Sequence, residues 1–477
     1  MRNELFIDNE WRAAGSGETF DVVNPATEEV LTSVAKATPD DVNAAVESAR
    51  ACLESDGWAS LSGRRRGQML YRAAEILEER KKDVASLETK QNGKPFFESM
   101  IDVSMTIETL RYYAGWADKY TGNVLNVEGG DFVYTVREPV GVVAAIVPWN
   151  FPLNLASWKF APALAVGCTV ILKPASETPL TALAMAEIMA DAGLPPGAFN
   201  VLTGGGSTVG AGLVKHAGVD KVAFTGSTAV GQQLMKDAAD TVKRITLELG
   251  GKSPNIIFAD ADLKAAIRGA QNGIFYGKGE VCAAGSRLLV HREVHDQVVE
   301  QLAERSKKLV PGDPFDKNTR LGAVVSKSQQ ETVLGYIEAG KQEATLVAGG
   351  NPAQVDGKGF FVEATVFDNA KPGMKIVDEE IFGPVLSVIT FDDIDEGIAL
   401  ANQTKYGLAA GVWTQNIKTA FRVARALKAG TVWVNTYNLY DPSAPFGGFK
   451  ASGFGRDLGR EALGGYTETK TVWMGLR

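Results

Sequence analysis

Near the start of the chain, from Leu5 to Val34, apolar and polar residues alternate around two turn sequences, Asp8–Asn9 and Asn24–Pro25. A period of two is typical of strands, and Asn, Asp and Pro are favoured in turns. This segment is therefore predicted to form strands joined as hairpins.

Helical patterns follow, of which the second breaks near Asn92–Gly93 and the third ends at Gly122. The predicted helices are Asp40–Glu54, Gly63–Glu88 and Phe97–Tyr120. Beyond them, Asn123–Arg137 and the C-terminal Tyr466–Met474 have the pattern of strands, and periodicity alone says nothing more about either.

Strands and helices alternate from Glu138 to Glu248, which indicates a parallel sheet with right-handed crossovers. The predicted strands are Val142–Val147, Thr169–Lys173, Phe199–Leu202 and Lys221–Thr225, and the helices are Trp158–Val166, Pro179–Ala192, Val209–His216 and Val230–Ala239. Two glycine turns, Gly204–Gly210 and Gly226–Gly231, each connect a strand to a helix. That position suits a pyrophosphate at a helix N-terminus, although ordinary turns between strand and helix look the same in sequence.

The second half of the chain, from Ser253 to about Phe446, repeats the alternation. Its predicted strands are Asn255–Phe258, Arg287–Val290, Val385–Phe391, Gly411–Trp413 and Thr431–Asn435. A second α/β domain is expected here, with a ligand site in the cleft between the two domains.

The composition narrows the functional classes. The chain has 477 residues, of which 45% are hydrophobic and 22% charged, an ordinary globular balance, and its net charge of −8 argues against a nucleic-acid partner. Three widely spaced cysteines form neither a disulfide framework nor a metal cluster, so no metal site is expected. The N-terminus lacks the apolar region of a signal peptide, and no run of about 18 apolar residues could span a membrane. A cytoplasmic protein without a membrane partner is expected.

A glycine-rich stretch, Phe275–Arg287, contains the candidate nucleophile, Cys282. Glycines at 277, 279 and 285 allow close backbone approach to a ligand and leave amide groups free to face an oxyanion. A loop with an incidental thiol is the alternative.

Two further residues could serve the same chemistry. Glu248 lies in an apolar strand-like run that breaks at Gly250–Gly251. Partial burial there would raise the pKa of its carboxyl group and suit it to act as a general base. The alternative is a glutamate of an edge strand exposed to solvent. Asn150 follows a strand and lies between Pro148 and Pro152, so a stiff turn holds its amide, a group that can stabilise an oxyanion.

Six motifs along the chain resemble those of the NAD(P)-dependent aldehyde dehydrogenases, in the same order and at compatible spacing. They are VPWNFPL (147–153), FTGSTAVG (224–231), LELGGKSP (247–254), GEVCAAGSR (279–287), EEIFGPV (379–385) and PFGGFKASGFGRDLG (445–459). The resemblance covers nearly the whole chain. It implies an α/β fold with a Rossmann-type cofactor domain (1–122 and 139–249), a catalytic domain (250–446) and oligomerisation or bridging segments (123–138 and 447–477). The segment 123–138 would be a β-ribbon arm that pairs with the C-terminal strand and builds a homo-oligomer, a dimer or a tetramer.

The resemblance also implies the reaction, oxidation of an aldehyde to a carboxylic acid in the hydrolytic, non-acylating branch of the family. Cys282 would attack the aldehyde, Asn150 and the Cys282 N–H would hold the oxyanion, and Glu248 would activate the water that hydrolyses the thioester. A proton path through Lys159 and Glu468 is a further hypothesis. A catalytically silent relative would lack Cys282 or Glu248, and a CoA-acylating relative would lack the glutamate; both residues are present.

The cofactor implied by the resemblance is NAD or NADP. The expected cofactor-binding residues are Ile146, Val147, Pro148, Trp149, Lys173, Ser176, Gly206, Gly210, Phe224, Gly226, Ser227, Glu248, Leu249, Gly250, Glu380 and Phe382. NAD-preferring relatives often have a glutamate where this chain has Ser176. Serine does not repel a 2′-phosphate, so we expect NADP to be accepted, unless the neighbouring Glu177 restores the repulsion.

The substrate tunnel implied by the family alignment is lined by Phe151, Trp158, Tyr276 and Tyr440. These rings favour aromatic or medium-chain aliphatic aldehydes, with betaine aldehyde as the alternative through cation–π attraction and a semialdehyde less favoured. The chain departs from the family at Gly277, commonly Asn, and at Glu280, commonly Gln. A carboxylate facing the thiol would raise its pKa, so we expect Glu280 to point away and to bond the loop backbone.

Overall fold

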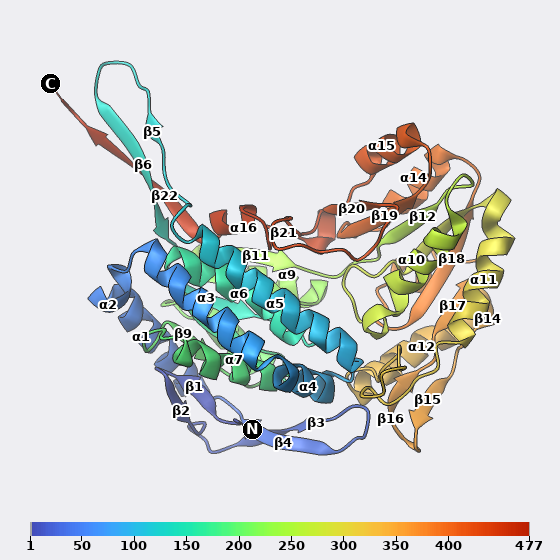
Figure 1. The fold of residues 1–477 in the computed structure, drawn as a ribbon, viewed down its shortest axis with the longest axis horizontal. Helices are drawn as coiled ribbons and strands as arrows, with labels where there is room; N and C mark the ends of the chain where they lie inside the picture. The colour runs from blue at the N-terminus through green and yellow to red at the C-terminus, as the bar shows by residue number, and fades with distance from the viewer. Residues whose placement is uncertain (1, 477) are drawn as a thin grey trace.

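The computed structural model describes residues 2–476, and Figure 1 shows two lobes with a long arm projecting from one of them. The first lobe is built on an eight-stranded sheet of order β2-β1-β9-β8-β7-β10-β11-β21. In that order the strands are Glu10–Arg12, Leu5–Ile7, Phe199–Val201, Thr169–Lys173, Val142–Ile146, Lys221–Thr225, Arg244–Glu248 and Gly453–Phe454. Strands β9, β8, β7, β10 and β11 run parallel, which confirms the predicted parallel sheet.

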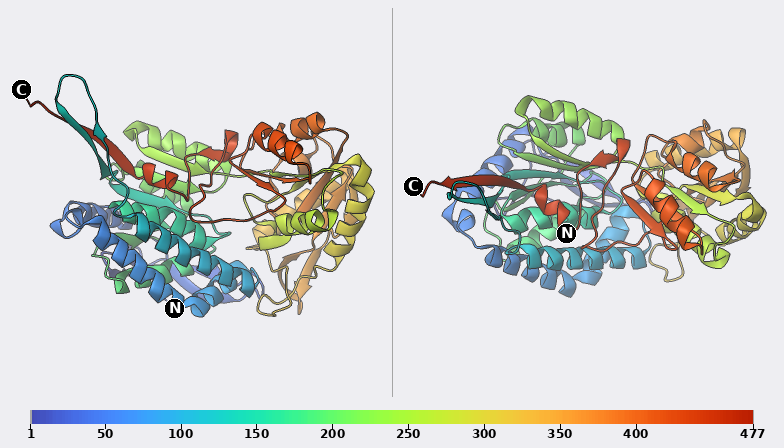
Figure 2. Two further views of the ribbon diagram at one scale, coloured as in Figure 1. Left: turned by 45° about the horizontal axis from the view of Figure 1, so that its top comes forward. Right: turned by 90° about the horizontal axis from the view of Figure 1, so that it is seen from above.

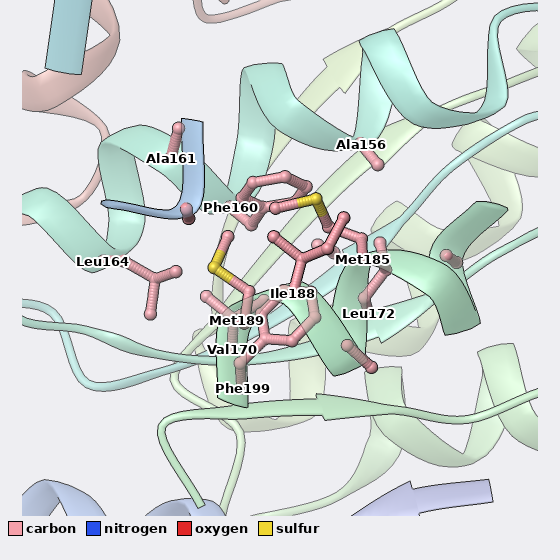
Figure 3. Close-up of a cluster of buried hydrophobic side chains, with 14 of the residues drawn as sticks. Ala156, Phe160, Ala161, Leu164, Val170, Leu172, Met185, Ile188, Met189 and Phe199 are labelled. Atoms are coloured by element: carbon pink, nitrogen blue, oxygen red, sulfur yellow. The ribbon is translucent and has the colours of Figure 1, made fainter. Parts of the chain in front are cut away.

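Both faces of this sheet are covered by helices. On one face lie α3 (Gly63–Glu79), α4 (Lys81–Asn92), α5 (Phe96–Trp116), α6 (Pro152–Val166) and α7 (Leu180–Asp191), and on the other lie α1 (Pro39–Glu54), α8 (Ala211–Lys215) and α9 (Thr228–Ala238). Alternate residues of β7 point to opposite faces, Val143 to the first core and Val142 to the second, as a strand buried on both sides requires. Figure 3 shows part of the first core, where Phe160 of α6 and Met189 of α7 pack together over the sheet.

The second lobe contains a seven-stranded sheet of order β14-β17-β18-β13-β12-β19-β20. The strands are Thr345–Ala348, Thr365–Asp368, Val385–Phe391, Arg287–His291, Pro254–Ile257, Ala409–Trp413 and Thr431–Val434. All neighbours are parallel except β14 and β17. Helices α10 (Leu263–Phe275) and α11 (His295–Lys307) contribute to the core on one face, and α12 (Lys327–Glu343), α13 (Lys375–Asp378), α14 (Ile394–Asn402) and α15 (Ile417–Ala426) to that on the other. The predicted second α/β domain is confirmed.

The arm is a three-stranded antiparallel sheet that extends away from the first lobe (Figure 2). Strand β6 (Phe132–Pro139) pairs with β5 (Val124–Leu125) on one side and with the C-terminal β22 (Thr467–Met474) on the other.

The remaining elements are short. They are β3 (Thr19–Val23), β4 (Val30–Ala35), β15 (Pro352–Val355), β16 (Lys358–Val362), α2 (Asp56–Ala59), α16 (Glu461–Gly464) and the turns η1 (Gly206–Gly210), η2 (Ala239–Thr241), η3 (Tyr276–Gly279), η4 (Arg292–Val294) and η5 (Lys450–Ser452).

The predicted helix Gly63–Glu88 is wrong as a single element. The chain breaks at Arg80, whose φ of −97° and ψ of 9° end α3 and start α4. The Arg80 guanidinium donates to Glu187 of α7 at 2.8 Å, and α4 packs against α5 and α7. An amphipathic pattern continues through a break of one residue, so it did not indicate this change of direction. Similarly, α6 begins at Pro152 rather than Trp158, because proline fits the first turn of a helix.

Candidate active site

The carboxyl ends of the parallel strands in the first lobe bring several predicted cofactor-binding residues to one edge. Val147 follows β7 and donates its N–H to the Lys173 carbonyl at the end of β8, 3.1 Å away. Gly226 follows β10 and donates to the carbonyl of Glu248 at the end of β11, 3.0 Å away. Ligands of doubly wound α/β sheets bind at this edge.

Two turns at this edge lead into helices. Ser227 is the N-cap of α9 and its hydroxyl accepts the N–H of Val230 at 3.3 Å. A Cβ at Gly226 would lie 2.4 Å from the Phe224 ring, so a larger residue there would displace that ring. The other turn differs from the prediction, because Gly206–Gly210 forms one turn of π-helix before the short α8 instead of leading directly into a helix from Val209. A Cβ at Gly206 would meet no atom within 4 Å, so this turn is open on one side.

Lys173 and Ser176 lie at the end of β8. The Lys173 ammonium is buried and donates to the Pro174 carbonyl at 2.7 Å, and burial lowers its pKa to about 8. The Ser176 hydroxyl donates to the Gly204 carbonyl at 3.3 Å. Glu177 is exposed, and its charge acts on Lys173.

Glu380 and Phe382 reach the same region from the second lobe. A Glu380 carboxylate oxygen accepts the N–H of Gly251 at 2.9 Å, and a Cβ at Gly250 would lie 2.0 Å from the other oxygen. The Phe382 ring meets the Trp149 ring edge-on, with centroids 5.2 Å apart. Burial raises the pKa of Glu380 to about 7. Residues of both lobes therefore contact one another at this edge of the first sheet.

Cys282 lies after a tight bend in which Gly277, Lys278 and Gly279 all have positive φ, between 58° and 72°. Its side chain lines a cavity of about 680 Å³. Burial, together with Glu380 and Glu248, raises the pKa of the Cys282 thiol to about 12. In this state the side chain is a neutral thiol, so attack on a carbonyl would require a base to remove its proton.

Asn150 is held against the loop that contains Cys282. Its amide nitrogen donates to the Glu280 carbonyl at 2.9 Å, while its side-chain oxygen is buried without a hydrogen-bond partner among residues 2–476. The Glu280 carboxylate forms an ion pair with Lys278 at 2.8 Å and accepts the N–H of Val325 at 3.0 Å. The expectation that Glu280 bonds to the backbone is confirmed.

Glu248, the last residue of β11, is buried, and within the described chain neither carboxylate oxygen makes a hydrogen bond of ordinary geometry. Burial and the nearby Asp457 raise its pKa well above the usual value, although Lys159 counteracts them. The expected direction of this pKa shift is thus confirmed. Lys159 pairs with Asp457 at 2.8 Å, whereas Glu468 pairs with Arg244. Lys159 and Glu468 thus have different ion-pair partners, and the proton path through these two residues stays a prediction.

The cavity at Cys282 is lined by all four aromatic residues expected from the sequence. Phe151 and Tyr276 stack with centroids 6.4 Å apart, and Trp158 and Tyr440 lie 6.0 Å apart. Sequence reasoning missed several other lining residues, among them Phe97, Glu98, Asp102, Arg305, Arg320 and Phe446. Phe446 could have been found from its place in the PFGGFKASGFGRDLG motif. The others come from helices and loops without a motif.

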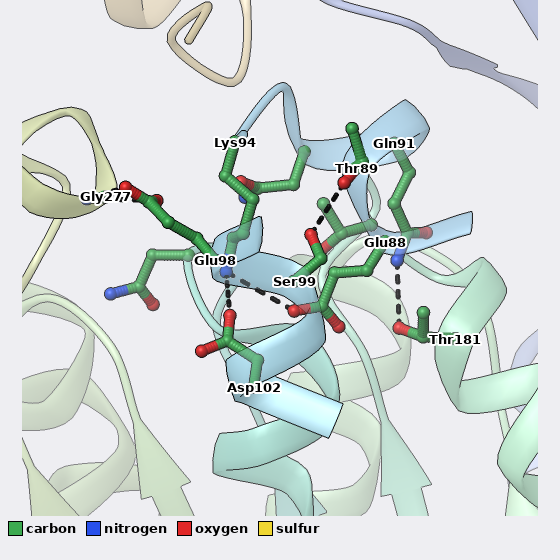
Figure 4. A network of polar contacts seen from close by, with 12 residues as sticks. Glu88, Thr89, Gln91, Lys94, Glu98, Ser99, Asp102, Thr181 and Gly277 are labelled. Atoms are coloured by element: carbon green, nitrogen blue, oxygen red, sulfur yellow. Dashed lines mark hydrogen bonds and ion pairs between the residues drawn. The ribbon is translucent and has the colours of Figure 1, made fainter. Parts of the chain in front are cut away.

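Glu98 and Asp102 of the cavity wall belong to a buried ionic cluster, which Figure 4 shows. The Lys94 ammonium contacts Asp102 at 2.5 Å and Glu88 at 3.3 Å. Glu98 accepts the N–H of Gly277 at 3.2 Å, which ties α5 to the loop that precedes Cys282. The cluster therefore connects the two lobes beside the candidate nucleophile.

Comparison with known proteins identifies the class that this fold and site define. The model of the aldehyde dehydrogenase family matches residues 11–472, and the chain belongs to that family. The mitochondrial aldehyde dehydrogenase of Rattus norvegicus is 47% identical over 98% of this chain and 91% of its own length. The expected family and enzyme class are confirmed: the protein is an aldehyde dehydrogenase, an oxidoreductase that oxidises aldehydes.

Two solved structures are particularly similar. The NAD+ complex of an aldehyde dehydrogenase from Bacillus cereus superposes with a TM-score of 0.98 at 49% identity, covering 100% of this chain and 97% of that one. The indole-3-acetaldehyde dehydrogenase AldA of P. syringae, in complex with NAD+ and IAA, has a TM-score of 0.98 at 47% identity, covering 99% and 97%. These likenesses confirm the expected fold class.

Two other kinds of site are absent from residues 2–476. None of the helices there is both long and apolar enough to cross a membrane. No group of three His, Cys, Asp or Glu side chains is placed to hold a metal ion.

Proposed function

We propose that this aldehyde dehydrogenase works through a covalent intermediate at Cys282. The observation that supports this most strongly is that Cys282 lines the large cavity while the amide of Asn150 is held against its loop and the charge of Glu248 acts on its thiol. In the first step, the sulfur bonds to the aldehyde carbon and the thiol proton passes to Glu248. The carbonyl oxygen becomes an oxyanion that accepts hydrogen bonds from Asn150 and the Cys282 N–H.

Glu248 is suited to act as the base because its carboxylate is buried and has a raised pKa. A carboxylate whose pKa approaches the operating pH accepts protons more readily than one in water. After the first step it must release the proton. It can then take a proton from the water that adds to the thioester, and breaking of the carbon–sulfur bond regenerates Cys282 and frees the carboxylic acid.

The cofactor proposed for this edge of the first sheet is NAD+. The residues fit a dinucleotide: α9 begins at the sheet edge, the turn at Gly206 is open, and the Glu380 carboxylate reaches Gly251 from the second lobe. When bound, a nicotinamide supplies a hydride acceptor, and loss of the hydride turns the thiohemiacetal at Cys282 into a thioester. Trp149 and Phe382 would flank the nicotinamide end of the site, and Lys173 and Ser176 the adenosine end. The NAD+ complex of the similar Bacillus cereus enzyme supports this choice.

NADP+ is proposed as a second accepted cofactor. Ser176 offers a hydroxyl beside the Lys173 ammonium, and both could bond to a 2′-phosphate. The exposed Glu177 opposes this only if its side chain turns towards the ribose.

The proposed substrates are aromatic or medium-chain aliphatic aldehydes, since Phe151, Trp158, Tyr276 and Tyr440 all line the cavity next to Cys282. Betaine aldehyde is the second candidate, because aromatic faces attract a quaternary ammonium. The test is kcat/KM for benzaldehyde, hexanal, betaine aldehyde and succinic semialdehyde, measured without CoA. Benzaldehyde or hexanal should rank first. Succinic semialdehyde ranking first would contradict the proposal, and a requirement for CoA would indicate the acylating branch.

The arm formed by β5, β6 and β22 is proposed to build a dimer or tetramer. Its outer residues include apolar side chains that are unusually exposed, such as Trp473 at 62%. The domain boundaries at 122, 138, 249 and 446 and a cytoplasmic location stay predictions.

A further inference from the structure

The cavity that contains Cys282 changes character along its length. Near the thiol its wall is aromatic and buried, as Trp158 and Phe446 are only 4% exposed. At the other end several lining residues reach the molecular surface, including Leu439 at 64% and Phe97 at 38% exposure. We call this end the mouth. Two positively charged side chains of the cavity wall lie at the mouth. They belong to Arg305, from α11, and to the exposed Arg320.

Both guanidinium groups are held in place by neighbouring groups. Arg305 is half-buried, and its Nε donates to the Gln271 side-chain oxygen at 2.6 Å. Arg320 lies over the Phe97 ring, 4.9 Å from its centroid, and one of its terminal nitrogens donates to the Thr319 carbonyl at 3.0 Å. Gln271 and Phe97 themselves line the cavity. The arginines are thus positioned before any ligand arrives, which lowers the entropic cost of binding one.

Neither arginine has a carboxylate partner among the ion pairs formed within residues 2–476. Arg305 uses only its Nε, so both of its terminal nitrogens remain available as donors in the described chain. Elsewhere in the described chain, Arg111 pairs with Glu78 and Arg422 with Asp395. Two fixed, unpaired guanidiniums facing one cavity are a recognised way to bind an anionic group.

The two acidic residues of the cavity wall do not cancel this charge. Asp102 is paired with the buried Lys94, and Glu98 accepts the Gly277 N–H. Burial raises the pKa of Glu98 to about 8, so this carboxyl is largely protonated at pH 7. The described wall, together with Lys94 behind it, is therefore net positive at the mouth and close to neutral beside the thiol.

We propose that the preferred aldehydes carry an anionic group, such as a carboxylate, at the end opposite the aldehyde, and that Arg305 and Arg320 bind it at the mouth. The inference rests on the proposed function, in which the aldehyde lies at Cys282. The apolar middle of the cavity requires an alkyl or aromatic spacer between the two ends. A short semialdehyde would instead leave its charge among aromatic rings, where an unpaired carboxylate is costly.

The test compares octanal with 8-oxooctanoate, which have the same spacer and differ in the terminal carboxylate, and with 8-aminooctanal. In the wild type, kcat/KM should be higher for 8-oxooctanoate than for octanal by about tenfold or more, and lowest for the amine. Arg305→Gln and Arg320→Gln should each reduce the preference for the anion by about three- to tenfold, leaving octanal nearly unchanged. Arg305→Lys should retain part of the preference for 8-oxooctanoate over octanal, and added salt should weaken that preference in the wild type.

Arg268→Gln is the matched control, because Arg268 is an exposed arginine of α10, the helix that carries Gln271, and does not line the cavity. Equal kcat/KM values for octanal and 8-oxooctanoate, or a preference that survives both substitutions, would overturn the inference. Binding of octanedioate and octanoate to the enzyme by calorimetry provides a readout independent of catalysis. If no aldehyde were oxidised, the proposed function would fail, while tighter binding of octanedioate, lost in the Arg305→Gln variant, would still support the anion site.

Discussion

Replacing Lys94 by Met should destabilise the protein more than any similar change at its surface. The Lys94 side chain is 1% exposed, and its ammonium contacts Asp102 and Glu88, which are 3% and 0% exposed. Burial alone would lower the pKa of Lys94, but the two carboxylates outweigh it and raise the pKa. Removing one partner of such a buried pair costs about 3–5 kcal/mol, because the remaining charge is left uncompensated. Methionine has a similar length, so little of this loss comes from a cavity.

The cost can be converted into a melting temperature. An unfolding entropy of about 2 cal/mol/K per residue gives about 1 kcal/mol/K for this chain, so Tm should fall by about 4 °C in calorimetry at fixed protein concentration. Lys341→Met is the control, because Lys341 forms its ion pair with Glu338 on an exposed helix surface, and it should shift Tm by less than about 1 °C.

The destabilisation by Lys94→Met should also depend on pH. Burial raises the pKa of Glu88 in the folded protein to about 8, and Lys94 is the group that counteracts this. Without Lys94 the folded-state pKa rises further. A carboxyl with a raised folded-state pKa favours folding below its unfolded value of about 4.5, and this contribution is lost as the pH rises. The difference in Tm should therefore be larger at pH 8.5 than at pH 5.5. A difference below about 1 °C, or one independent of pH, would refute the reasoning.

Two predictions concern the reaction itself. Cys282→Ala should reduce aldehyde oxidation, and any esterase activity, to below about one per cent of wild type, because both need the same sulfur; higher residual turnover in steady-state assays would indicate another nucleophile. NADP+ should support oxidation with a kcat/KM of at least about a thousandth of that with NAD+, since Ser176 does not repel a 2′-phosphate; a lower ratio would show that Glu177 or another group excludes it.

The strands and the order of the elements could largely be predicted from the sequence, because buried strands have continuous apolar runs bounded by glycine and proline. Thr169–Lys173, Lys221–Thr225 and Val385–Phe391 have the same bounds in the structure as in the prediction. The break at Arg80 could not be predicted from the sequence, because it depends on the packing of α4 against α7 rather than on a local signal.

The candidate site likewise has residues that could be predicted from the sequence and residues that could not. Cys282 lies in a motif, Trp158 and Tyr440 were expected from the family alignment, and the structure brings all three to one cavity. Arg305 and Arg320 at the mouth come from a helix and a loop of the second lobe, where charged residues are common and only the folded chain shows which ones face the cavity. The raised pKa of Cys282 was also beyond sequence reasoning, because it depends on how deeply the loop is buried and on the positions of Glu380 and Glu248.

The most direct test of the proposed chemistry is rapid-quench analysis of Glu248→Gln with hexanal and NAD+. Solvent can accept the thiol proton in place of Glu248, so the first turnover should slow less than hydrolysis of the thioester, which should slow by about 10²–10⁴-fold. A burst of NADH approaching one equivalent per subunit should appear, and mass spectrometry should find a hexanoyl group on the peptide containing Cys282. A steady-state rate equal to that of wild type, or an acyl group on a different residue, would contradict the account.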